Sequence, residues 1–200
     1  MAVTRVETNG ISLSVSVEGP EDGRPVLLLH GFPDSHNIWR HQVDALTAAG
    51  YRTIAPDQRG YGESDAPEDV DAYAIPNLAM DALGVLDALG IERAAVVGHD
   101  WGASVAWLAA TFGADRVERL CTVSVGHPTA FFSAGGFEQK EKSWYMLFYQ
   151  AEGTAEEWLS RDGFANLRAL AHDPVDFERN AVDMAKPSRE SHSSAVPSAW

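Results

Sequence analysis

Continuous apolar runs dominate the first 126 residues of this chain. Residues 11–19, ISLSVSVEG, alternate between apolar and polar side chains with period two, which predicts an antiparallel edge strand. Four other segments are apolar without alternation, as is typical of strands buried on both faces of a sheet: PVLLLHG, YRTIAP, RAAVVGH and VERLCTVSVG. The pattern therefore predicts several strands of one central sheet.

Helical spacing of apolar residues separates these runs. One helix is marked by Trp39, Val43 and Leu46, a second runs from Pro76 to Gly90, and a third begins just after Asp100. Strands that alternate with helices predict an α/β fold, a mostly parallel sheet with helices on both faces. We assign residues 1–127 to this core.

The pattern of apolar and polar residues changes after Pro128. The segment FFSAGG predicts a loop, and the residues that follow predict consecutive helices with no buried strand between them. We therefore assign residues 128–186 to a partial helical cap. Residues 187–200 are serine-rich and aperiodic, which predicts a disordered tail.

Length, composition and charge limit the kinds of partner and location that we expect for this chain. The chain has 200 residues, enough for one domain with a sizeable core, and 15 basic residues against 29 acidic ones give a net charge of −14. No basic patch is visible, which argues against nucleic acid or an anionic membrane as a partner. The N-terminus lacks an apolar leader and no apolar run could span a bilayer, so we expect a cytoplasmic protein. The composition leaves the oligomeric state open.

Cysteine and histidine usage argues against disulfides and metals. The single cysteine, Cys121, cannot form an internal disulfide, and its apolar neighbours predict a buried, inert thiol. No histidine and cysteine grouping has the spacing of metal ligands. We therefore predict neither a metal nor a cofactor.

The segment VVGHDWGAS, residues 96–104, has the spacing of a nucleophile elbow, with an aspartate at its tip. Glycines stand two residues before and two after Asp100, directly after a buried strand and at the start of a helix. Such glycines allow a sharp turn that presents the central side chain at the carboxyl end of the strand. The alternative is that Asp100 only caps the helix.

A second motif follows an earlier strand. LLLHGFPDS places His30, Gly31, Phe32 and Pro33 where this type of fold supplies a backbone amide to an oxyanion hole. An ordinary Gly-Pro turn is the alternative. Two such turns in the correct strand order favour an active site.

Three motifs together resemble a known family. HGFPDSHNIWRHQ, APDQRGYGESDAP and GHDWGASVAW are similar to the α/β-hydrolase fold and, in this combination, to its epoxide hydrolase branch. The resemblance runs from about Val6 to about Gln150. It implies an aspartate nucleophile at Asp100, oxyanion amides from Phe32 and Trp101, and a helical cap over the site.

Carboxylate chemistry agrees with this resemblance. A serine must lose a proton before it attacks, whereas a carboxylate is already anionic near neutral pH. At an acyl carbon it would give a labile anhydride, but at an sp³ carbon it gives an ordinary ester. The sequence therefore favours opening of a small apolar epoxide, or halide displacement, through an ester on Asp100.

The cap carries a candidate proton donor. In SWYMLFYQ, Tyr145 and Tyr149 lie four residues apart beside an apolar stripe. The resemblance gives Tyr145 the role of binding the epoxide oxygen and leaves Tyr149 as a residue that lines the substrate site. Without the resemblance, both tyrosines could simply pack their rings and expose their hydroxyls.

The histidine that would activate water for ester hydrolysis is not evident. His30 and His99 precede the nucleophile and are interpreted as residues that shape the turns. His127, His172 and His192 follow it, but none is preceded by a returning strand. We therefore expect the C-terminal core strands to be absent, and the chain to be incomplete or inactive in the second step.

Two alternatives remain at this point. Haloalkane dehalogenation shares the aspartate and can use a tryptophan at the position of Trp101 to hold the halide. The chain could also be a non-catalytic truncated fragment or binding protein, with apolar surface exposed where core strands are missing.

Overall fold

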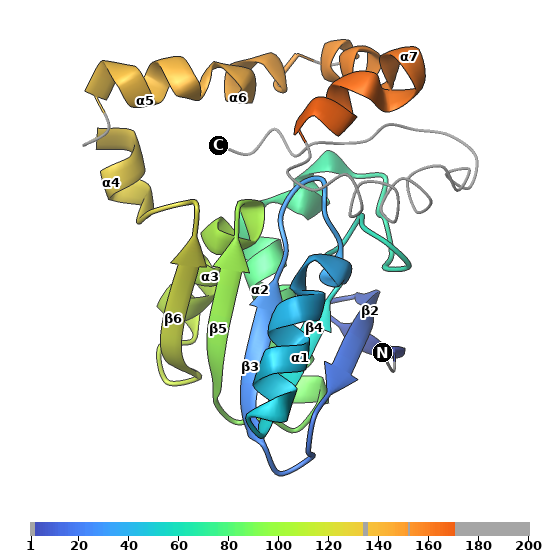
Figure 1. Cartoon of the computed structure of the whole chain (residues 1–200), viewed down its shortest axis with the longest axis vertical. Helices are drawn as coiled ribbons and strands as arrows, with labels where there is room; N and C mark the ends of the chain where they lie inside the picture. Colours follow the sequence, from blue (N-terminus) through green and yellow to red (C-terminus); the bar gives the residue numbers. More distant parts are fainter. Residues whose placement is uncertain (1–2, 134–135, 152, 171–200) are drawn as a thin grey trace.

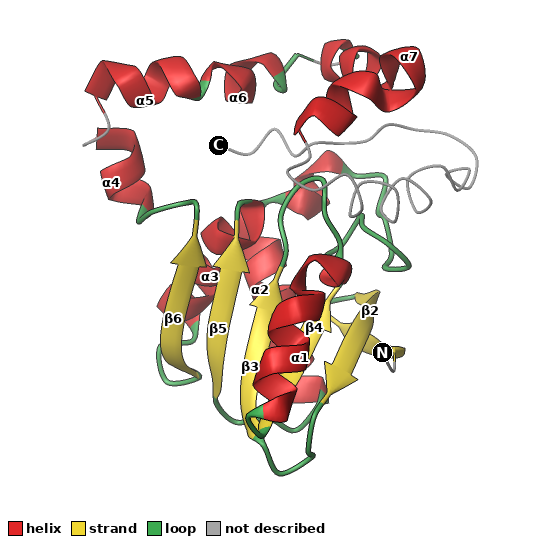
Figure 2. Ribbon diagram, viewed as in Figure 1, coloured by secondary structure: helices red, strands yellow, loops and turns green. Residues whose placement is uncertain are grey.

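A six-stranded mixed sheet forms the centre of the computed structural model, which describes residues 3–133, 136–151 and 153–170 (Figure 2). In spatial order β1-β2-β4-β3-β5-β6, the strands β4, β3, β5 and β6 are parallel to one another, β2 is antiparallel to β4, and β1 is antiparallel to β2. The strands are β1 (Val3–Thr8), β2 (Ile11–Glu18), β3 (Arg24–Leu29), β4 (Tyr51–Pro56), β5 (Ala94–His99) and β6 (Val117–Val123). The predicted α/β class is confirmed.

Helices cover both faces of this sheet (Figure 1). Helix α1 (Arg40–Ala48) follows the short 3-10 helix η1 (His36–Trp39) and packs on one face, whereas α2 (Ile75–Ala88) and α3 (Trp101–Phe112) pack on the other. A second 3-10 helix, η2 (Val70–Tyr73), precedes α2. The larger apolar core lies between the sheet and α2 and α3 and includes Leu13, Leu29, Ile54, Leu86 and Val105.

The N-terminal edge of the sheet differs from the prediction. The alternating segment 11–19 does form an antiparallel strand, β2, but it lies between β1 and β4 and is therefore not at the edge. The edge strand is β1, which the pattern analysis did not predict. Its residues are mostly exposed, with only Val6 fully buried, so it carries little apolar signal.

Two further predictions, the burial of strand β6 and of Cys121, are wrong at the opposite edge of the sheet. Strand β6 was expected to be buried on both faces, yet Glu118, Arg119, Cys121 and Val123 are exposed. In the part of the chain that the structure describes, β6 pairs only with β5 and is the outermost strand. Cys121 is therefore an exposed thiol and not a buried, inert one.

Four helices lie over the carboxyl ends of β3, β5 and β6 (Figure 1). They are α4 (Pro128–Ser133), α5 (Gly136–Lys142), α6 (Trp144–Phe148) and α7 (Thr154–Leu170), the last with a kink at residues 161–164. The predicted loop FFSAGG is partly wrong, because its first three residues belong to α4. The predicted tail, 187–200, lies outside the described residues, as does the end of the predicted cap.

No helix within residues 3–133, 136–151 and 153–170 combines the length and the apolar character needed to cross a membrane.

Candidate active site

Asp100 stands on a sharp turn between β5 and α3. Its backbone has φ 52° and ψ −122°, a left-handed conformation that is uncommon for a residue with a side chain. A Cβ atom on Gly98 would collide with the Gly102 backbone, and one on Gly102 would collide with the His30 carbonyl oxygen. The glycines therefore let β5, α3 and the end of β3 approach closely enough to form the turn.

The Asp100 side chain does not cap the helix. Asp100 occupies the N-cap position of α3, but its carboxylate makes no capping hydrogen bond to the helix. One carboxylate oxygen, Oδ1, instead accepts a hydrogen bond of 3.0 Å from the backbone N–H of Phe32. The alternative reading of Asp100 as a simple helix cap is therefore wrong.

Phe32 brings its backbone amide to Asp100 from the loop after β3. The loop approaches because residue 31 is a glycine: a Cβ atom there would lie 2.5 Å from both Cβ and Oδ1 of Asp100. The peptide bond between Phe32 and Pro33 is cis. Trp101 is the first residue of α3 and its half-buried ring packs against the larger core. The role of its amide stays a prediction.

Replacing Gly31 by alanine should disturb this approach. Because the added methyl group would overlap the Asp100 side chain and lie 2.8 Å from the His99 carbonyl oxygen, we expect Gly31→Ala to lower the free energy of unfolding by about 1–3 kcal/mol. Urea denaturation measures this change. Gly126→Ala is the matched control, since a Cβ atom there meets nothing within 4 Å. Equal midpoints for the two variants would contradict the close approach.

The negative charge of Asp100 acts on two tyrosines, Tyr145 and Tyr149. Burial and then the negative charge of Asp100 raise the pKa of Tyr145 above the usual 10.0. Burial, then Tyr145 and then Asp100 raise the pKa of Tyr149 as well. The Tyr145 and Tyr149 rings meet edge to face at 5.7 Å, and Tyr149 also meets the Phe32 ring at 6.1 Å. Tyr149 therefore joins the helical segment after β6 to the loop after β3 at Phe32.

Tyr61 is a neighbour of the site that the sequence analysis did not single out. It lies in the loop after β4, edge to face with the buried His30 ring at 4.9 Å. Burial, and then the negative charges of Asp100 and Asp34, raise the pKa of the Tyr61 phenol. Its position between two glycines, 60 and 62, is the only local signal that could have drawn attention to it.

Three charged residues of the DQRGYGESD loop, Asp57, Arg59 and Asp65, have structural partners. Asp57 accepts from the His36 ring and backbone N–H at 2.8 Å each, and these bonds contribute to a lowered pKa of Asp57 despite burial. Arg59 forms a buried ion pair with Asp81. Asp65 accepts from the Ser12 backbone at 2.9 Å.

The histidines named from the sequence occupy different places. The His30 ring is fully buried and contacts the Gly31 carbonyl oxygen, which agrees with its predicted part in shaping the turn. His99 lies 3.9 Å from the Asp34 carboxylate. His127 follows β6, is exposed and packs edge to face on Trp107 at 4.8 Å. His172 and His192 lie outside the described residues.

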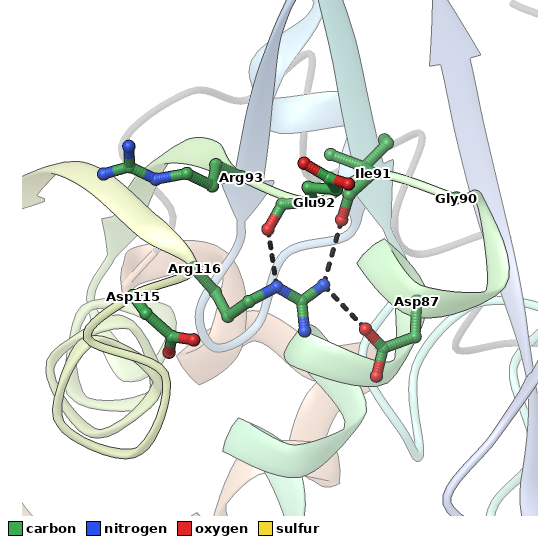
Figure 3. Close-up of a pocket in the computed structure, with 7 residues that line it drawn as sticks. All are labelled: Asp87, Gly90, Ile91, Glu92, Arg93, Asp115 and Arg116. Carbon is green, nitrogen blue, oxygen red and sulfur yellow. Dashed lines mark hydrogen bonds and ion pairs between the residues drawn. The ribbon is translucent and has the colours of Figure 1, made fainter.

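A groove of about 500 Å³ lies at the other end of the sheet, where β5 and β6 begin (Figure 3). Arg116 in this groove donates to Asp87 at 2.6 Å and to the backbone carbonyls of Ile91 and Glu92 at 2.9 and 2.5 Å. Because these bonds occupy its guanidinium, Arg116 holds the end of α2 to the sheet. Open parallel sheets bind ligands at the carboxyl ends of the strands, where Asp100 lies.

Within the described residues, no group of three or more histidine, cysteine, aspartate or glutamate side chains could hold a metal ion.

A mostly parallel sheet with an aspartate on a sharp turn between β5 and α3, facing the Phe32 backbone amide, is typical of an α/β hydrolase. Comparison with known proteins agrees: the family described as alpha/beta hydrolase fold matches residues 24–192, and the chain belongs to that family.

Within the family, its relatives include epoxide hydrolases. The chain is 46% identical over 174 residues to epoxide hydrolase A of Mycobacterium tuberculosis, covering 82% of this chain and 52% of that protein. It is 42% identical over 156 residues to epoxide hydrolase 3 of Siraitia grosvenorii, covering 76% and 49% respectively. The chain thus spans about half the length of the curated relatives it matches.

Solved structures agree with the fold. The structure is similar to a mutant epoxide hydrolase from Bacillus megaterium, solved in complex with a naphthyloxy-propanediol product. The TM-score is 0.81 at 32% identity, over 89% of this chain and 65% of that one. Epoxide hydrolase A from Mycobacterium thermoresistibile gives a TM-score of 0.72 at 38% identity, over 90% and 59%.

Proposed function

We propose that Asp100 opens an epoxide by attacking one of its ring carbons, so that the enzyme produces a diol through an alkyl ester. The observation that carries this proposal is the 3.0 Å hydrogen bond from the Phe32 N–H to Asp100 Oδ1. It fixes the carboxylate with one oxygen bound and the other available for attack. A fixed, anionic carboxylate is a nucleophile suited to an sp³ carbon.

The first step forms a bond between a carboxylate oxygen and an epoxide carbon. The ring C–O bond breaks, its electron pair goes to the ring oxygen, and that oxygen takes a proton from the Tyr145 phenol. In the second step, water attacks the ester carbonyl carbon. The Phe32 amide, and by our prediction the Trp101 amide, stabilise the developing oxyanion. The bond between the ester carbonyl carbon and the alkyl oxygen then breaks; one proton of the water goes to the released diol oxygen and the other returns to the Tyr145 phenolate, so that Asp100 is again a carboxylate.

The second step also needs a base to deprotonate water, and we infer that neither His30 nor His36 supplies it. Neither nitrogen of the His30 ring is available for this, since one lies 2.9 Å from the Gly31 carbonyl oxygen and the other accepts from Gln58. The His36 ring is bound to Asp57.

Intact-mass spectrometry tests the proposal directly. The Bacillus megaterium relative binds an aryloxy-propanediol product, so phenyl glycidyl ether is a suitable probe. The exposed Cys121 thiol could itself react with an epoxide, so the parent for all such measurements is Cys121→Ser. We expect a mass increase of one epoxide, located at Asp100 by peptide mapping. If neither an adduct nor a diol formed, the proposal would be overturned.

The Tyr145 phenol should set the alkaline limit of alkylation. Because its pKa is raised, the phenol stays protonated through neutral pH, and the alkylation rate should fall only above its ordinary value of 10.0. Replacing Tyr145 by phenylalanine should lower the rate about a hundredfold and remove that alkaline fall. Single-turnover rates against pH measure both effects, with Tyr51→Phe, at the start of β4, as the control. An unchanged profile in Tyr145→Phe would exclude it as the donor.

The alternative, haloalkane dehalogenation, uses the same aspartate. A halide leaves without a proton, whereas an epoxide oxygen needs one, so the two protonated phenols near Asp100 favour the epoxide. Halide release from 1-chlorohexane, without reaction of the epoxide, would reverse this preference.

A further inference from the structure

We propose that His30 is a positioning residue: its neutral ring holds the Gly31–Phe32 peptide so that the Phe32 N–H points at Asp100. This inference rests on the proposed function for its catalytic meaning. Its structural part concerns a buried side chain that the proposed reaction does not itself use.

The hydrogen bonds of His30 determine where its proton lies. The backbone N–H of Gln58, which can only donate, lies 3.0 Å from Nε2 of His30. Nε2 must therefore be an unprotonated acceptor. In a neutral ring the proton is then on Nδ1, and Nδ1 donates to the Gly31 carbonyl oxygen at 2.9 Å.

This bond fixes one side of the peptide that carries the oxyanion amide. The Gly31 carbonyl and the Phe32 N–H belong to the same peptide unit, and in a trans peptide they point in opposite directions. Two donors, His30 Nδ1 and the Asp34 backbone N–H at 3.0 Å, hold the carbonyl. The Phe32 N–H must therefore point the other way, where it meets Asp100 Oδ1 at 3.0 Å.

The ring is itself anchored from a different strand. Gln58 follows β4, and besides its backbone N–H its side-chain amide donates to the His30 carbonyl oxygen. His30 is fully buried and packs edge to face with Tyr61. The orientation of the Phe32 amide therefore depends on the end of β4 as well as on its own loop.

The surroundings keep His30 neutral, as this arrangement requires. Burial lowers the pKa of His30, and His36 and His99 act in the same direction. Asp57 and the hydrogen bond to Gly31 act in the opposite direction, but burial dominates. A second proton would also place an N–H on Nε2 against the Gln58 N–H, donor against donor.

Two substitutions separate the functions of the two ring nitrogens. The side-chain amide of asparagine can replace the donor at Nδ1 but does not reach Nε2, whereas the longer glutamine can replace the acceptor at Nε2. We expect His30→Asn to retain most of the alkylation rate of the Cys121→Ser parent and His30→Gln to lower it about tenfold. The amide proton of Phe32 should lie downfield in the parent and in His30→Asn, and move upfield in His30→Gln.

The expected order of the two variants distinguishes positioning from stability. If His30 only filled space, the alkylation rate and the chemical shift of the Phe32 amide proton would change in step with the melting temperature of each variant. They would not depend on whether the new side chain donates a hydrogen bond to the Gly31 carbonyl oxygen. Equal effects of the two substitutions, or a larger effect for asparagine, would overturn the proposal.

One measurement needs no substitution at His30 and no substrate. In the parent protein, ¹⁵N spectra of the His30 ring should show a protonated Nδ1 and an unprotonated Nε2 at neutral pH. The opposite tautomer or a charged ring would overturn the inference even if both variants failed to fold. If the parent formed neither an epoxide adduct nor diol, the proposed function would fail, while the ring and amide spectra would still decide the positioning role.

Discussion

Asp100→Asn should abolish the epoxide adduct, with the alkylation rate falling roughly a thousandfold or more. Asparagine has the shape of aspartate and keeps a carbonyl oxygen that can accept the Phe32 hydrogen bond, now 3.0 Å long. It lacks the negative charge that attacks an sp³ carbon. The change therefore removes the nucleophile and leaves the elbow and the loop after β3 in place.

The measurement is the rate of adduct formation in the Cys121→Ser parent with and without Asp100→Asn. Asp34→Asn is a suitable comparison, because this carboxylate also lies near the site, 3.9 Å from His99, but not on the elbow. It should form the adduct, and all three proteins should unfold at similar urea concentrations. An adduct that persisted in Asp100→Asn would place the reacting group elsewhere.

The elbow and the loop after β3 could be predicted because their signals are local. Glycines at 98 and 102 permit the turn at Asp100, and Gly31 permits the approach of Phe32, so short segments carry most of the geometry. The parallel strands were also predictable, because burial on both faces gives continuous apolar runs such as that of β3.

Features that depend on distant partners could not be read from the same patterns. Strand β1 is a mostly exposed edge, so its sequence does not alternate clearly. The apolar sequence of β6 predicted burial, but exposure depends on what packs beside a strand, and Cys121 was misjudged for that reason. The His30 ring contacts Gln58 and Tyr61, which follow a different strand, so this packing could not be read from the sequence around either strand.

Asp81 is another residue whose importance appears only in three dimensions. It lies on the buried face of α2, where a helical pattern alone would favour an apolar residue. Arg59 donates to both of its carboxylate oxygens at 2.6 and 2.7 Å, and Asn9 donates to it at 2.9 Å. Both members of the ion pair are almost fully buried, with side chains 4% and 5% exposed.

Asp81→Asn should lower the free energy of unfolding by about 3–5 kcal/mol, because it leaves the buried Arg59 cation without a counter-ion. Since a typical domain is stable by only about 5–15 kcal/mol, urea denaturation should show a large fall in the midpoint. Asp87→Asn, on the same helix, is the matched control: this carboxylate is 62% exposed and pairs with Arg116, so its loss should cost less than about 1 kcal/mol.

A double variant separates the buried charge from the lost bonds. If the unpaired cation causes the instability, Arg59→Met combined with Asp81→Leu should recover much of the stability that Asp81→Asn loses, since apolar pairs often replace buried ion pairs without loss. A double variant as unstable as Asp81→Asn would show instead that the hydrogen bonds from Arg59 to the Ala72 carbonyl and from Asn9 to Asp81 are the main contribution. In either case the loop after β4 would be held to α2 by this pair, and through Gln58 that loop also binds the His30 ring at the end of β3.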